Sequence, residues 1–261
     1  MRWRPVRRLI AILLFVVAGL VCAADVPAIA AAADLKFALA EIARTFEKDT
    51  GRKLRLSFGS SGNFTHQLEQ GAPFELFLSA DENYIFRLAE KGIAADRGVL
   101  YAIGRVVMFA PHGSTLQVDA QLADLKTALG DGRLKRFAIA NPDHAPYGRA
   151  ARAALQQAGL WATIQPKLVL GENASQATQF AAAGSSQGGI VPLSLSKAPE
   201  IARLGTFALI PAEWHAGEPL RQRMALTKKA GETARAFYAY LQQPVARAVF
   251  VRHGFELPEE K

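Results

Sequence analysis

Short apolar segments alternate with amphipathic ones along the chain, and this pattern predicts an α/β fold. An apolar strand at 27–33 is followed by Leu35, Leu39 and Ile42 at helical spacing, and Gly51 ends that helix. Further strands are predicted at 53–58, 74–78, 99–111, 136–141, 167–170, 189–193 and 221–226. Further helices are predicted at 63–70, 81–88, 122–129, 147–158, 174–183 and 233–253, the last interrupted by Pro244.

The first 24 residues predict a cleavable signal peptide. Four arginines precede an almost uninterrupted apolar run at 9–21, and the small residues Ala23 and Ala24 suit cleavage. This run is shorter than the roughly 20 apolar residues that a membrane-spanning helix requires, which disfavours a membrane anchor. Cys22, the only cysteine, would leave with this segment, so we expect no disulfide in the exported chain.

The length of the remaining chain predicts two lobes. About 237 residues are more than one small domain normally contains. Two long extended stretches, near Gly104 and Met224, are the predicted crossings between the lobes. The predicted division is a signal peptide at 1–24, a discontinuous domain I at 25–105 and 225–261, and a continuous domain II at 106–224.

Charge and motifs exclude several functions. The formal charge of +8 includes the four arginines of the signal segment; 27 basic and 23 acidic residues remain, and no basic stripe is interleaved with aromatics, so nucleic acid is not an expected partner. The five histidines lack metal-ligand spacing, and His144 is interpreted as a solvated loop residue. Neither a P-loop, a dinucleotide fingerprint nor a nucleophile elbow is present. We therefore expect neither an enzyme nor a cofactor.

Three turns share one design, in which a strand ends, small or polar residues follow and a helix begins. They lie at 33–35, 59–62 and 145–148, and a fourth candidate lies at 171–175. Ligands of open α/β sheets bind beyond the carboxyl ends of the strands, where helix starts present unpaired N–H groups and partial positive charge. If the turns converge, they form an anion site without lysine or arginine, to which Ser61 adds a hydroxyl. Each turn taken alone is more typical of simple helix capping than of ligand binding.

The segments that carry a family resemblance are 31–35, 57–62, 71–81, 141–148, 238–241 and 252–255. In this order they resemble the periplasmic molybdate-binding proteins of molybdate ABC importers, and the segment 71–81 is the most specific of them. The resemblance implies the type II periplasmic-binding-protein fold, with two lobes joined by two crossing strands and the ligand in the cleft between them. It also implies a monomer in the periplasm that delivers a small oxyanion to a membrane permease.

The resemblance extends to single residues. Ser61 matches a serine that gives the oxyanion its hydroxyl and backbone N–H, whereas Tyr147 and Ala174 match backbone N–H donors. Asp34 stands where the family usually has a neutral polar ligand residue, and an ionised carboxylate is only an acceptor. Either Asp34 turns aside and caps its own helix, or it is protonated when the anion is bound. Pro192 is a second departure, because some members have a tyrosine there.

The expected ligand is molybdate, with tungstate as a near-equal ligand, because neutral donors distinguish anions by size, shape and charge. Two alternatives stay open. The first is a binding protein of the same fold for another oxyanion or a small organic acid, which usually recruits an arginine; Arg149 lies close to Tyr147 in the sequence. The second is an exported hydrolase, which requires a nucleophile and base that the sequence does not reveal.

Overall fold

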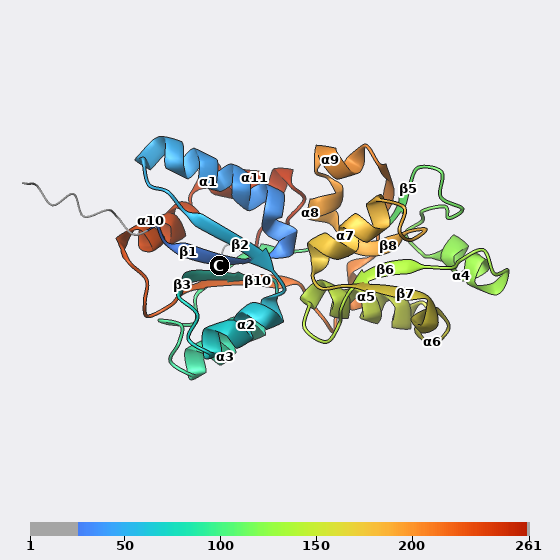
Figure 1. The fold of residues 1–261 in the computed structure, drawn as a ribbon, viewed down its shortest axis with the longest axis horizontal. Coiled ribbons are helices and arrows are strands. Elements are labelled where there is room, and N and C mark those ends of the chain that lie inside the picture. The colour runs from blue at the N-terminus through green and yellow to red at the C-terminus, as the bar shows by residue number, and fades with distance from the viewer. Residues whose placement is uncertain (1–25, 260–261) are drawn as a thin grey trace, which may run out of the picture.

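The computed structural model describes residues 26–259, which form two lobes lying side by side (Figure 1). Each lobe contains a five-stranded sheet with helices on both faces, as the alternating pattern predicts. The predicted signal peptide at 1–24, with Cys22, lies outside the described residues. Within residues 26–259, no helix has the length and apolar character needed to cross a membrane.

The first lobe is built from both ends of the described chain. Its strands are, in spatial order, β2 (Arg55–Gly59), β1 (Ala28–Ala32), β3 (Phe74–Ser79), β10 (Arg221–Leu226) and β4 (Val99–Ile103). β1 is parallel to β2 and β3, whereas β10 is antiparallel to β3 and β4. One face of the sheet packs against α1 (Lys36–Thr50), α10 (Glu232–Tyr240) and α11 (Pro244–Arg252), and the other packs against α2 (Ser61–Glu69) and α3 (Glu82–Glu90).

The second lobe is one continuous segment. Its strands are, in spatial order, β7 (Leu168–Gly171), β6 (Phe137–Ala140), β8 (Gly189–Pro192), β5 (Val106–Pro111) and β9 (Gly205–Leu209). One face packs against α4 (Ala123–Gly130) and α5 (Pro146–Gln157), and the other against α7 (Ala174–Ala182). The shorter helices are α6 (Trp161–Ile164), α8 (Leu193–Ser196) and α9 (Pro199–Ala202), with 3-10 turns η1 (Ala33–Leu35), η2 (Gln165–Lys167) and η3 (Ala212–His215).

Local sequence signals set several helix ends. Gly51 follows α1 in the left-handed conformation, with φ of 70°. The Asp81 carboxylate accepts a hydrogen bond from the Asn83 amide at the start of α3, and the Asn173 side chain accepts one from the Gln176 amide at the start of α7. These caps fix where each helix begins relative to the strand before it.

Two connections join the lobes. β4 and β5 occupy different sheets, and the chain passes between them through Gly104 and Arg105, where the predicted long strand is broken. The Gly104 amide donates to the Leu220 carbonyl at 2.9 Å, which ties the outgoing connection to the returning one. β10 pairs with the first sheet from Arg221 onward, so the chain has already returned before residue 224, where the crossing is predicted.

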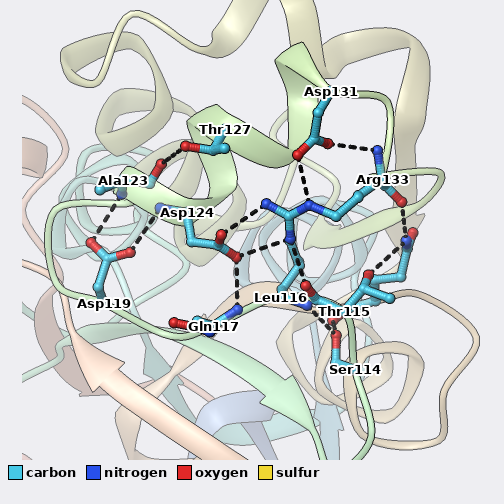
Figure 2. Close-up of polar contacts among 11 residues, drawn as sticks. Ser114, Thr115, Leu116, Gln117, Asp119, Ala123, Asp124, Thr127, Asp131 and Arg133 are labelled. Atoms are coloured by element: carbon cyan, nitrogen blue, oxygen red, sulfur yellow. Dashed lines mark hydrogen bonds and ion pairs between the residues drawn. The ribbon is translucent and has the colours of Figure 1, made fainter.

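A cluster of ion pairs and hydrogen bonds lies on the surface of the second lobe around α4, away from the first lobe (Figures 1 and 2). The Arg133 guanidinium donates to Asp124 at 2.9 Å, to Asp131 at 2.7 Å and to the Thr115 carbonyl at 2.7 Å. The Asp119 carboxylate accepts from backbone amides at the start of α4. These contacts fix the loop before α4 and the turn after it. The charged side chains of the cluster therefore bind one another and the backbone, which is a structural role.

Phe46 joins α1 to α10, the penultimate helix of the described chain. Its ring is 1 % exposed and lies 5.1 Å from the Phe237 ring and 5.3 Å from the Tyr240 ring, both in edge-on geometry. We expect Phe46→Ala to lower the free energy of unfolding by about 3–5 kcal/mol in chemical denaturation, because it opens a cavity at this junction. Val251→Ala on the exposed side of α11 serves as the control and should change it by less than about 0.5 kcal/mol. Equal effects of the two substitutions would contradict this packing.

Candidate anion-binding site between the lobes

A small cavity of about 10 Å³, enough for about one water molecule, lies between the two lobes. The first lobe lines it with Ala32, Ala33, Asp34, Gly59, Ser60, Ser61 and Ala80, and the second with Ala145, Pro146, Tyr147 and Ala174. The structure thus brings Asp34, Ser61, Tyr147 and Ala174, the four residues singled out from the sequence, to one place. Pro192 is not among the lining residues; it ends β8 and precedes α8.

Four helix starts meet at this cavity. η1 follows β1, α2 follows β2, α5 follows β6 and α7 follows β7, so each start lies beyond the carboxyl end of a strand. The first amides of a helix have no carbonyl partner within that helix and carry partial positive charge. The described lining residues include neither lysine nor arginine. Any positive polarisation at the cavity therefore comes from backbone amides, and Asp34 is the one ionisable carboxyl group among the described lining residues.

Ser61 is positioned to donate its hydroxyl. The residue is 1 % exposed, and its Oγ accepts a hydrogen bond from the Ala80 amide at 3.0 Å. A hydroxyl has one proton to donate in addition to its acceptor lone pairs, and this proton is directed away from the Ala80 amide. Ser61 is also the first residue of α2, so its backbone amide belongs to the same helix start. The residue can offer two donors to one ligand.

Asp34 is a buried carboxylate without a cationic partner. Its Oδ2 accepts a hydrogen bond from Gln222 Nε2 at 2.6 Å, whereas Oδ1 is buried and has no partner among the described residues. Burial raises the pKa of Asp34 to about 6, although hydrogen bonds from Gln222, from Tyr147 and from its own amide favour the ionised form. The starts of η1 and α1 have no side-chain capping hydrogen bond, so the carboxylate turns toward β10.

Gln222 fixes the surroundings of Asp34 and was not predicted as a site residue. Its Oε1 accepts from the Tyr101 hydroxyl at 2.8 Å, and its Nε2 also donates to the Tyr147 hydroxyl at 3.1 Å. Gln222 is fully buried, although its neighbours in the sequence of β10 are both arginines. The alternation of that strand places Gln222 on the same inward face as Met224, so a polar residue at an apolar position is the sequence signal that could have revealed it.

The lobes touch each other beside the cavity. The His144 carbonyl of the second lobe accepts from the Ser60 hydroxyl at 2.6 Å and from the Gly62 amide at 3.0 Å. A Cβ atom on Gly62 would lie 2.6 Å from the same carbonyl, so only glycine permits this approach. The interpretation of His144 as a solvated loop residue is wrong, because its ring Nδ1 also lies 3.0 Å from Ser60 Oγ. The lobes are therefore in a closed arrangement.

Arg149 lies beside the cavity but does not line it. Its guanidinium forms an ion pair with Asp81 of the first lobe, donates to Glu218 at 2.8 Å and to the Tyr84 hydroxyl at 3.1 Å. If the ligand were a small organic acid, its carboxylate would be expected to bind Arg149. Two carboxylates of the protein already bind this arginine. Arg149 instead holds the two lobes together.

Comparisons with known proteins agree with this geometry. The family model of the bacterial extracellular solute-binding proteins matches residues 28–256. The molybdate-binding protein ModA of Azotobacter vinelandii is 38 % identical over 243 residues, which cover 91 % of this chain and 93 % of the relative. ModA of Rhodobacter capsulatus is 36 % identical over 218 residues, 82 % of each chain.

A solved structure gives the same result for the fold. The periplasmic molybdate-binding protein of Azotobacter vinelandii superposes with a TM-score of 0.79 at 29 % identity, over 89 % of this chain and all of that chain. This match confirms the predicted two-lobed periplasmic-binding-protein fold. By both sequence and fold, the chain belongs to the bacterial extracellular solute-binding proteins and, among them, to the ModA family.

Proposed function

We propose that this protein captures molybdate in the periplasm for an ABC importer, with tungstate as a near-equal ligand. The observation that carries the proposal is the convergence of four helix starts and the Ser61 hydroxyl on a closed cavity whose lining lacks lysine and arginine. Neutral donors arranged in this way suit a small tetrahedral dianion, because every oxygen can accept hydrogen bonds from fixed amides. The relatives named as molybdate-binding proteins identify the ion.

The size of the cavity favours an inorganic ion. Pockets for drug-sized organic ligands are typically about 300–1,000 Å³, whereas this cavity measures only about 10 Å³. With Arg149 engaged by Asp81 and Glu218, a carboxylate ligand would find no arginine among the described lining residues. Both observations favour an oxyanion over a small organic acid.

Capture follows from closure of the lobes. Ser61 and Asp34 come from the first lobe, whereas Tyr147 and Ala174 come from the second, so a ligand that contacts all four stabilises the closed form by its differential affinity. The contacts of Ser60 and Gly62 with His144 reinforce that form. A membrane permease can then recognise the closed protein, which acts as a monomer after export by the signal segment at 1–24.

Calorimetry with three anions tests the ligand. For the exported protein, we expect molybdate and tungstate to bind within about ten-fold of each other, because an array of neutral donors scarcely separates ions of nearly equal size. Sulfate is smaller and should bind much more weakly in the same cavity. Tight sulfate binding with no molybdate heat would refute the proposed ligand.

Removal of the Ser61 hydroxyl tests the site. Ser61→Ala should weaken molybdate binding by about 1–3 kcal/mol, because a buried charged acceptor then lacks one donor. Thr127→Ala serves as the control and should leave the affinity unchanged. The Thr127 hydroxyl donates to the Ala123 carbonyl within α4 of the second lobe, away from the cavity (Figure 2). An unchanged affinity in Ser61→Ala would place the ligand elsewhere.

A methyl group at Gly62 tests closure. Gly62→Ala should weaken molybdate binding by about ten-fold or more, because the added atom overpacks the contact with His144 and disfavours the closed form. Small-angle X-ray scattering should show that molybdate contracts the wild-type protein and contracts the variant less. Gly130→Ala, where a Cβ atom meets open space, is the matched control. Equal contraction of all three proteins would show that this contact plays no part in closure.

A further inference from the structure

Asp34 presents a conflict of charge at the proposed site. It lines the cavity, is 2 % exposed and forms no ion pair with any described residue. An ionised carboxylate beside a dianion would add strong repulsion in a region of low dielectric, and it has no proton to donate. The same residue carries a buried oxygen, Oδ1, without a hydrogen-bond partner. One change removes both problems, namely a proton on Oδ1.

The groups around Asp34 determine which of its oxygens takes the proton. Gln222 is oriented by the Tyr101 hydroxyl, which donates to Oε1 and leaves Nε2 to face Asp34. Burial raises the pKa of Tyr101 well above its ordinary value, so this hydroxyl keeps its proton. Because Oδ2 already accepts a short N–H hydrogen bond at 2.6 Å, it is the better acceptor when it stays unprotonated, and the unpartnered Oδ1 is free to hold the proton. Oδ1 is the oxygen that can carry it.

The surrounding elements supply no compensating cation. The elements packed against η1 are α1, α7, α8 and β2, and α7 and α8 contain no titratable side chain. The bases on α1 are Lys36, which lies over the Phe37 ring, and the exposed Arg44 and Lys48. The base on β2 is Arg55, which is exposed at the end of the strand opposite Gly59. None of these four side chains pairs with Asp34 in the described structure. Tyr101 and Tyr147 face Asp34 as neutral hydroxyls. Ser194 contacts only the Asp34 backbone carbonyl.

We propose that Asp34 binds the oxyanion as a neutral carboxylic acid, with the proton on Oδ1 donated to an anion oxygen and Oδ2 accepting from Gln222. The inference rests on the proposed function, since it concerns the same cavity. In this step the Asp34 carboxylate takes one proton from solvent and becomes a carboxylic acid. The acid then donates a hydrogen bond to the bound dianion. The protein therefore takes up one proton for each anion that it captures.

Proton uptake at Asp34 makes the affinity for the anion decrease as the pH rises. Burial raises the pKa of Asp34 to about 6, so at neutral pH the free protein is mostly ionised at this residue and must gain a proton on binding. Affinity should be highest below pH 6, where the free residue is already protonated, and should fall by about ten-fold per pH unit well above pH 6. In the variant Asp34→Asn, the amide oxygen can accept from Gln222 while the amide nitrogen donates to the anion, so its affinity should not depend on pH.

Calorimetry with sodium molybdate at pH 6, 7 and 8, in two buffers of different ionisation enthalpy, tests the inference on the exported protein. We expect wild type to take up close to one proton per ion at pH 8 and to lose affinity at about ten-fold per pH unit. Asp34→Asn, checked for folding by its thermal melt, should bind equally at all three pH values. Ser61→Ala, which retains Asp34, should bind more weakly but keep the wild-type slope.

The outcomes separate the inference from the proposed function. Wild-type binding that is independent of pH and takes up no proton would overturn the role of Asp34 and leave molybdate capture intact. A pH slope that persists in folded Asp34→Asn would also overturn it, because the proton would then belong to the anion or to another group. Absence of molybdate binding by wild type at every pH would instead refute the proposed function.

Discussion

A dianion can leave water only where enough donors replace its hydration shell, and this requirement governs the arrangement of the molecule. The donors that we propose are amides at helix starts, which require no extra charged group and point in fixed directions. They can surround an ion only if two sheets bring the carboxyl ends of their strands face to face. The two lobes, the crossings at Gly104 and before Arg221, and the glycine contact at Gly62 all serve this approach.

Much of this arrangement is encoded locally and could be predicted. The alternation of apolar segments indicated all the strands except β9, whose edge position leaves residues such as Leu209 exposed and weakens the pattern. The turns before α2, α5 and α7 carry their own signals, which is why Ser61, Tyr147 and Ala174 could be singled out before their convergence was known. The resemblance then supplied the fold and the ligand class.

The parts that could not be predicted depend on contacts between distant segments. Gln222 meets Asp34 across 188 positions of sequence, and His144 meets Ser60 across 84. Neither pairing follows from propensity or spacing, because a side chain's neighbours across a cleft depend on how two lobes dock. Arg149 shows the same limit: its nearness to Tyr147 suggested a ligand contact, whereas Asp81 and Glu218 occupy its guanidinium.

The distribution of the chain between the lobes also bears on the order in which they form. The core of the first lobe combines Phe46 with Phe237 and Phe250, so it cannot be completed until the last helices have emerged. The second lobe lies between the crossings as one uninterrupted segment with its own apolar core. When the chain emerges from its amino terminus, the second lobe can therefore condense while the first still lacks α10 and α11.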